Sequence, residues 1–491
     1  MPARQIRALL SKYPRPHDCV WASLRPSGRA TSKGSIVYLP FVRRGHVERR
    51  RNTLAPIIAS ASMVKLSSSS SATPLAETER AELLDALRGF ALGGVCLANL
   101  FVSFSMWNEP SAPPAAALAT AATDPTAAFL IRALVDGKFY SLFSLLFGVG
   151  FAVQLQSATA RGDGRLVAYR RRLWVLLGIG LVHLLFVWNG DILAFYALVG
   201  LLLVRLRHLS DRALGRWVVM LLVLPVPLWA LFWLGGGWEA PVPLTLGIPF
   251  YAVGQAAVKS LGDKTYYQMM ANTDWGFAFR ALRVGAFFRA GSLLFEWRAF
   301  KVLAMFLVGL WLGRHQVFRQ LEAYRPLVRR VAVWGLVWGL STSLLNAYLD
   351  HSSDYYQGHA AGLSFAVLNA LGVAPLALGY AATFALAWQR PRMQQLLRPL
   401  APMGRMALTC YLSQSLIGTF LFTGLGLGWV GKVGPTLLWP LAAGIVLLQL
   451  LACRWWLQHF RFGPAEWLWR SLTYGKAQPM RRTVRLMPTA I

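Results

Sequence analysis

The chain has 491 residues, of which 56% are hydrophobic and only 14% are charged. Soluble domains carry about a quarter charged residues, so this composition excludes an ordinary soluble protein and predicts a membrane protein. The net charge of +30 could suit a nucleic-acid-binding protein. However, the positive residues lie between apolar segments and at both ends rather than in one patch, so no nucleic-acid partner is predicted. The cysteines are not closely paired, which predicts neither a disulfide framework nor a metal site.

Residues 1–79 differ from the rest of the chain and are interpreted as a basic, disordered N-terminal extension. The first 75 residues contain 13 Lys and Arg but only two acidic residues, and a run of five serines lies at 67–71. No apolar stretch here is as long as a signal-peptide core. The alternative is a translation start placed too early, with Met63 as the true start. No function is assigned to this extension.

From residue 83 onward, apolar windows of about 20 residues recur, which is the length that crosses the hydrocarbon core of a bilayer. The pattern predicts an all-α, polytopic membrane protein with about ten transmembrane helices, and nine or eleven remain open. The predicted transmembrane helices form an N-terminal membrane half (80–235) and a C-terminal membrane half (296–475), which is followed by a basic tail (476–491). The predicted spans are 86–106, 138–157, 172–188, 191–206, 215–235, 299–314, 328–349, 362–388, 405–427 and 436–459.

The distribution of charge between the spans predicts the orientation of the chain. The loop 158–171 contains four arginines, whereas 107–128 and 350–361 contain acidic residues and neither Lys nor Arg. Lys and Arg are enriched in cytoplasmic loops, so both termini are expected in the cytoplasm. On this topology, residues 236–295 form a long external loop, either a lid or binding loop or an ordered surface segment.

The first predicted span has one polar face. Asp85, Arg88, Cys96 and Asn99 fall within about a quarter of the helix circumference. Asp85 and Arg88 are expected to form an i,i+3 ion pair at the membrane interface or to contact a ligand. Asn99 lies deeper, where exposure to lipid is costly, so it should face other helices, as an interhelical contact or as a substrate contact.

His183 is the one histidine well inside a predicted span, and an imidazole there can serve as a general base or as a structural hydrogen-bonding group. Asp191 follows Asn189-Gly190, a sequence typical of a turn, and is interpreted first as a helix cap. Eight helical residues would separate His183 from Asp191 by about 12 Å, so no direct contact is predicted. The polar face of the first span is the expected partner of His183. Tyr196, one turn into the next span, could reach the same cavity.

The C-terminal segment 460–475 is predicted to be an interfacial helix rather than a catalytic element. Pro464 suits the first helical position. Trp467 and Trp469, next to Arg461 and Arg470, are typical of an anchor at the membrane surface.

Four stretches carry a resemblance to a known family: LLDALRGFALGGVCLANL (83–100), HLLFVWNGDILAFYALVGL (183–201), GRMALTCYLSQ (404–414) and FRFGPAEWLWRSLT (460–473). With these stretches, the chain from about residue 80 to 475 resembles the YeiB family of bacterial inner-membrane proteins, whose C-terminal half is a domain of unknown function. That family is grouped with transmembrane acyltransferases, and Leu84-Asp85 with Arg88-Gly89 is similar to their LD-x-x-RG opening. The resemblance implies a ten-helix fold in the bacterial inner membrane and acyl transfer across it. The chain departs from the acetyltransferases in having no histidine at 101–110.

The leading functional hypothesis is acyl transfer from a cytoplasmic donor to a small-molecule or glycan acceptor at the outer face. No bound cofactor is predicted, and acyl-coenzyme A is the donor considered. Arginine suits phosphate recognition, and His183 is the predicted catalytic base. The residues expected at the donor are Arg170, Arg171 and Arg172, and those expected at the substrate are Arg88, Asn99, Asp191 and Tyr196. The alternatives are a transporter or exporter of a small or amphiphilic solute, and a non-catalytic membrane partner protein.

Overall fold

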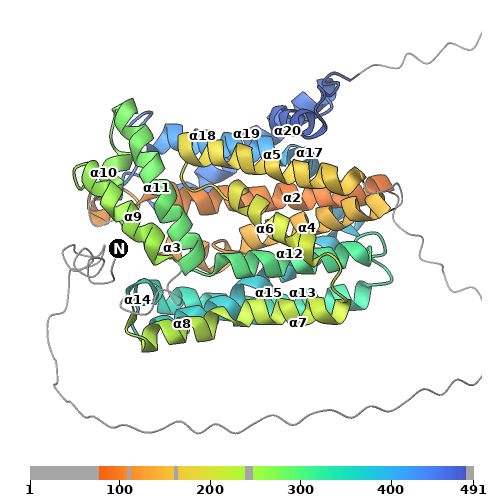
Figure 1. The fold of residues 1–491 in the computed structure, drawn as a ribbon, viewed down its shortest axis with the longest axis horizontal. Helices are drawn as coiled ribbons and strands as arrows, with labels where there is room; N and C mark the ends of the chain where they lie inside the picture. The colour runs from red at the N-terminus through yellow and green to blue at the C-terminus, as the bar shows by residue number, and fades with distance from the viewer. Residues whose placement is uncertain (1–76, 108–111, 160–163, 238–246, 483–491) are drawn as a thin grey trace, which may run out of the picture. The chain divides into compact units, whose positions relative to one another are not determined.

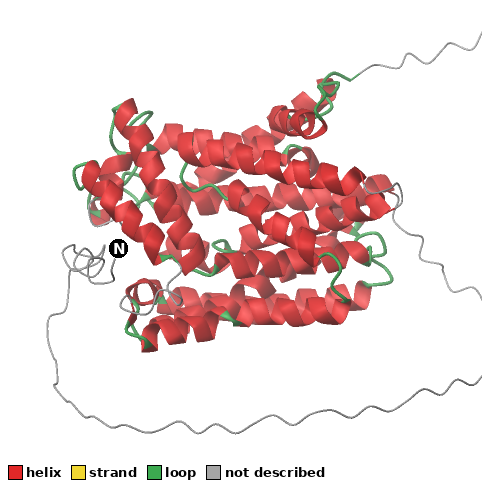
Figure 2. Cartoon of the chain, in the orientation of Figure 1, coloured by secondary structure: helices red, strands yellow, loops and turns green. Residues whose placement is uncertain are grey.

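A computed structural model of the protein describes residues 77–107, 112–159, 164–237 and 247–482. Within these ranges the chain is all-α, as predicted. No strand occurs among the described residues, and an isolated β-bridge joins Phe460 to Arg481 (Figure 2). The N-terminal extension up to residue 76, with the alternative start at Met63, and the end of the basic tail lie outside the described residues.

Each predicted span coincides with one helix or with two consecutive helical segments (Figure 1). In chain order these are α2 (Glu77–Asn99) with the π-helical η1 (Leu100–Ser105), α4 (Lys138–Thr159), α5 (Gly164–Phe186), α6 (Leu193–Leu206), α7 (Asp211–Val223) with α8 (Pro225–Leu234), α12 (Arg298–Arg314), α13 (Arg325–Leu349), α15 (Gly362–Trp388), α18 (Ala407–Phe422) and α19 (Pro435–His459).

Shorter helices lie between these long ones. They are η2 (Ala115–Ala117), α3 (Asp124–Leu134), α14 (Ser352–Gln357), α16 (Pro391–Leu397), η5 (Arg398–Leu400) and α17 (Ala401–Arg405). A last short helix, α20 (Pro464–Tyr474), follows α19. α20 begins with Pro464 at its first turn, as its sequence predicts.

Residues 236–295 contain three helices in their described part: α9 (Ile248–Ser260), α10 (Tyr266–Met270) and α11 (Trp275–Phe295). Thr265 and Gln268 form a reciprocal capping box at the start of α10. α11 packs against α5 and α9 and thereby approaches the turn between α5 and α6. The segment is therefore helical and packed where it is described.

The outer faces of the helices are those of a membrane protein. Six helical segments among the described residues are long and apolar enough to cross a bilayer. Large apolar side chains are exposed on several of them, including Trp334 and Trp338 of α13 and Leu448 of α19. Contiguous apolar surface of this kind is rare on soluble monomers and suits contact with lipid. The chain is thus an α-helical, multi-pass membrane protein.

Helices α4 and α12 approach closely through glycines. A Cβ atom at Gly309 would overlap the carbonyl oxygen of Leu145, and one at Gly148 would overlap that of Phe306. Small residues at such crossings let helix backbones come together, which is a common way to stabilise helix pairs in membranes. This contact holds one side of the cavity described below, because α4 forms part of its wall.

The substitution Gly309→Ala is expected to lower the free energy of unfolding by about 1–3 kcal/mol, because the added methyl group forces α4 and α12 apart. Gly178→Ala is the matched control. Its Cβ would meet no atom within 4 Å, so the better helix propensity of alanine should leave stability equal or raised by up to about 1 kcal/mol. Unfolding of both variants in the same detergent measures the difference. Equal stability of the two variants would contradict the close crossing.

Candidate functional site

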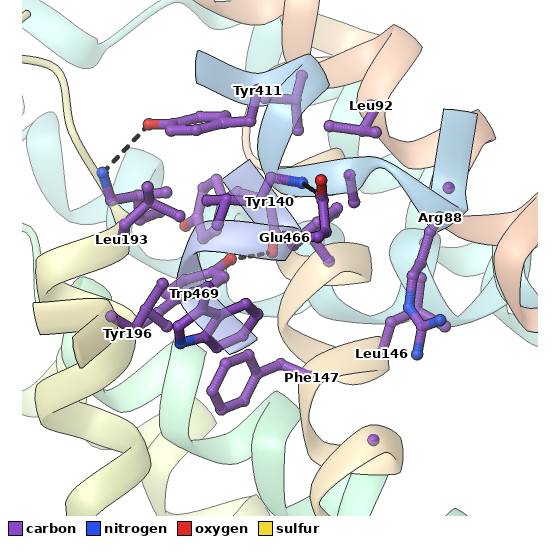
Figure 3. Close-up of a pocket in the computed structure, with 18 of the residues that line it drawn as sticks. Arg88, Leu92, Tyr140, Leu146, Phe147, Leu193, Tyr196, Tyr411, Glu466 and Trp469 are labelled. Atoms are coloured by element: carbon purple, nitrogen blue, oxygen red, sulfur yellow. Dashed lines mark hydrogen bonds between the residues drawn. The ribbon is translucent and has the colours of Figure 1, made fainter. Parts of the chain in front are cut away.

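A cavity of about 760 Å³ lies inside the helix bundle. α2 and η1 supply wall residues from Leu84 to Ser103, a length of about 28 Å at helical rise, which is close to the thickness of the hydrocarbon core. The other walls come mainly from α4, α5, α6, α18 and α20 (Figure 3). The cavity has two ends, named here the α20 end, near Arg88, and the α11 end, near Asn99.

The α20 end is strongly basic. Arg88 donates to the Asp85 carboxylate at 2.6 Å, which confirms the predicted i,i+3 pair. The guanidinium of Arg172 lies 3.9 Å from the centre of the Trp469 ring, and the Trp469 indole donates to the Arg172 carbonyl oxygen at 2.9 Å. A cation over an indole face is a favourable contact. The charged wall residues of this end are Arg88, Arg172, Arg405, Arg461 and Arg470, with the carboxylates Asp85 and Glu466.

α20 also contributes to the cavity wall, which its tryptophans did not predict. Glu466, Trp469 and Arg470 contribute to the cavity wall (Figure 3). Glu466 accepts hydrogen bonds from the backbone N–H groups of Leu408 at 2.6 Å and Thr409 at 3.1 Å, and from the Thr409 hydroxyl at 2.5 Å. A carboxylate at this position caps the N-terminal turn of α18. The two C-terminal motifs of the sequence therefore contact each other through one side chain.

The α11 end is polar and contains an irregular helix turn. α2 changes to π-helix after Asn99, and both Asn99 and Ser103 line the cavity. The Asn99 amide makes no side-chain hydrogen bond to any residue that the structure describes. π-Helical turns often occur at functional sites because they turn side chains out of register. Arg289 and Arg298, which sequence reasoning missed, also line this end.

His183 and Asp191 are in direct contact, so the predicted separation of about 12 Å was wrong. Nδ1 of His183 lies 2.9 Å from Oδ1 of Asp191, and both side chains are buried. The estimate assumed one continuous helix, but α5 ends at Phe186 and the chain reverses at Asn189-Gly190, bringing Asp191 back beside His183. Asp191 also caps α6, because its Oδ2 accepts from the Ala194 N–H at 2.9 Å. The predicted partner of His183, the polar face of α2, is not the one observed.

The His183–Asp191 pair lies behind the cavity wall. Neither side chain lines the cavity, whereas the neighbouring Gly190, Ile192 and Tyr411 do. The Tyr411 ring is centred 5.6 Å from the His183 ring, and its hydroxyl accepts from the Ile192 N–H at 3.3 Å (Figure 3). Nε2 of His183 is buried and has no hydrogen-bond partner among the residues described. The imidazole is therefore oriented through one nitrogen and unpaired at the other.

The remaining predicted site residues occupy different positions. The Tyr196 hydroxyl donates to the Tyr140 carbonyl oxygen at 2.7 Å and lies 2.7 Å from the Ser144 hydroxyl, so it is already engaged while the residue lines the cavity. Arg170 and Arg171 are exposed and are not among the wall residues, in contrast to Arg172. The three consecutive arginines differ because successive residues of a helix point about 100° apart.

The fold and the cavity define the class of the molecule as a multi-pass helical membrane protein with a charged internal cavity. Residues 312–476 match the family model described as "Protein of unknown function (DUF418)". The chain is 31% identical over 407 residues to the uncharacterized protein YeiB of Escherichia coli (strain K12), an alignment that covers 82% of this chain and 98% of that protein. The chain belongs to the YeiB family.

A second relative is the uncharacterized protein YxaH of Bacillus subtilis (strain 168), which is 27% identical over 441 residues. That alignment covers 85% of this chain and the whole of the relative. No solved structure matches this chain.

Glu466→Ala is expected to lower the free energy of unfolding by about 1–3 kcal/mol, because two backbone N–H groups of α18 lose their acceptor. Glu466→Gln keeps an acceptor oxygen and should lose less. Thermal unfolding of the purified protein in detergent compares the variants. Equal loss in both would contradict the capping role.

The pH dependence of the free energy of unfolding, compared between Glu466→Gln and the wild type, tests the environment of the Glu466 carboxyl group. Burial raises the pKa of Glu466 from its ordinary value of 4.5. A raised pKa stabilises the fold below the ordinary value, and this contribution is lost as the pH rises through the folded-state pKa. The stability of Glu466→Gln relative to the wild type should therefore increase as the pH rises from the ordinary pKa of 4.5 through the folded-state pKa.

Proposed function

We propose that this protein transfers an acyl group from a donor bound at the α20 end of the cavity to a hydroxyl or amine acceptor at the α11 end. The observation that carries the proposal is the continuous wall along α2, from the ion-paired Arg88 to the polar Asn99. A donor with a charged head and a long, flexible acyl-bearing arm fits a cavity that has five arginines at its α20 end and extends across the bundle. Acyl-coenzyme A has this form.

The α20 end supports binding of a phosphate-bearing head group. Five arginines line it against two carboxylates, which leaves an excess of positive charge. Guanidinium groups bind phosphate through paired N–H donors and do not lose their charge at working pH. Arg172 is held by Trp469 on one side, so little side-chain entropy remains to be lost on binding.

The proposed chemistry forms one bond and breaks one. The acceptor oxygen or nitrogen bonds to the thioester carbonyl carbon, the C–S bond breaks, and the donor leaves as a thiol that takes up the acceptor's proton. In the proposal His183 carries this proton on Nε2. Asp191 bonds to Nδ1 and so favours the tautomer in which Nε2 is the acceptor. Tyr411 separates the imidazole from the cavity, so the proposal requires the Tyr411 side chain to move when the acceptor binds.

The proposal places the protein in the bacterial inner membrane with the α20 end toward the cytoplasm. The arginine-rich loop 158–171 and the basic C-terminal tail support this orientation, because Lys and Arg are enriched on the cytoplasmic side. A cytoplasmic thioester could then serve an acceptor that never enters the cell.

A second candidate function is passage of an anionic, amphiphilic solute through the cavity without chemistry. It is favoured by the position of His183, which contributes nothing to the wall. Movement of an intact solute with no acylated product, measured in proteoliposomes, would support this candidate against acyl transfer.

Arg172→Ala is expected to weaken binding of acetyl-coenzyme A by about 10- to 100-fold, which corresponds to the loss of charged hydrogen bonds. Arg170→Ala is the matched control, because this arginine lies on the same helix but is exposed and off the wall. Equilibrium binding to the purified proteins decides between them. Equal affinities would contradict a donor site at the α20 end.

His183→Ala is expected to reduce acyl transfer by about 10²- to 10⁴-fold, the usual contribution of a general base, with unchanged affinity for the donor. The measurement follows label from acetyl-coenzyme A into acceptors of inverted membrane vesicles from cells that express each variant. A folded His183→Ala protein with full transfer would exclude the catalytic assignment.

A further inference from the structure

We infer that the α11 end of the cavity is a second anion-binding subsite, where the acceptor is held through a carboxylate or phosphate group. The inference deepens the proposed function and rests on it, because it names the chemical class of the acceptor. It concerns residues that the sequence motifs do not mark.

Arg289 carries the first part of the inference. Extending from α11 into the cavity wall, it donates to the carbonyl oxygens of Gly190 at 3.1 Å and Asp191 at 3.3 Å. These oxygens are neutral, so they orient the guanidinium without cancelling its charge. Burial and the nearby Arg298 lower the pKa of Arg289, which means that its surroundings disfavour the positive charge. An anion bound beside Arg289 would favour its positive charge.

Other cations surround the same end. Arg298 pairs with Glu296 and lies 5.8 Å from the centre of the Tyr140 ring. Lys138 is buried and donates to the Arg132 carbonyl oxygen at 2.7 Å, again a neutral partner. The charged groups gathered here are the cations Arg289, Arg298, Lys138 and Lys301 and the carboxylates Asp136 and Glu296. The Asp191 carboxylate is directed to His183 and the Ala194 N–H instead.

An anion bound at the α20 end cannot neutralise the positive charge of this cluster. The two ends, marked by Arg88 and Asn99, are about 16 Å apart along α2, so a phosphate group on Arg172 does not contact Arg289. Arg289 holds the turn that carries Asp191, the partner of His183. A ligand anion on Arg289 therefore lies next to the turn that orients the proposed base. This position suits the acceptor rather than the donor.

The test measures binding of small acceptor-like probes to the full-length protein in detergent, with coenzyme A, which carries no acyl group, at a saturating concentration so that the α20 end is occupied. Glycerol 3-phosphate is compared with glycerol, and D-glucuronate with D-glucose, by calorimetric titration. The anionic probe of each pair is expected to bind at least about tenfold more tightly, the gain of one charged hydrogen bond. Arg289→Gln and Arg298→Gln should each remove most of this preference. Arg170→Gln, which is exposed and off the cavity wall, should retain it.

Two results would overturn the inference: no preference for the anionic probes in the wild type, or a preference that survives in both α11-end variants. Should Arg289→Gln fail to fold through loss of the turn contacts, Arg298→Gln still decides, because Arg298 belongs to α12 and pairs with Glu296. The proposed function fails separately. A preference for anions that depends on Arg289 in a protein without acyl transfer would keep the subsite and exclude the transfer.

Discussion

Positive charge inside an apolar helix bundle has to be compensated, and this constraint shapes the whole interior. The arginines of the cavity each use a different neutral or acidic partner: Arg88 an aspartate one turn away, Arg172 an indole face, and Arg289 two backbone carbonyl oxygens. The contacts of Arg172 and Arg289 join segments that are far apart in the chain. Because removing one partner would leave a buried charge unpaired, the contacts hold α20 and α11 against the central helices.

The same constraint explains why the cavity has two unlike ends. At the α20 end, the C-terminal helix closes the bundle and adds Glu466, which caps α18 while its neighbours contribute cationic groups. At the α11 end, a segment between the two membrane halves folds back and reaches the turn between α5 and α6. The cavity has both of its ends only because α20 and α11 pack against the long helices. The function proposed here therefore depends on segments outside the long spans.

The reversal at Asn189-Gly190 has the largest consequence for chemistry. It converts a histidine and an aspartate eight residues apart into a buried hydrogen-bonded pair, and the same aspartate starts the next helix. A capping role and a role in orienting an imidazole are thus combined in one side chain. One side chain can make both contacts because its two carboxylate oxygens point in different directions. An asparagine at this position could still accept from the Ala194 N–H, but its NH2 group would donate to Nδ1 and favour the tautomer that is protonated on Nε2.

The sequence alone determined the helical class, the positions of the long apolar helices and the Asp85–Arg88 pair, because these depend on residues close together in the chain. Hydrophobic length and i,i+3 spacing are local properties. Only the tertiary structure decided that His183 meets Asp191, that Arg172 but not Arg170 faces the cavity, and that Arg289 and Glu466 belong to it. These outcomes depend on where a helix ends and on which distant helix packs beside it, and local spacing does not contain that information.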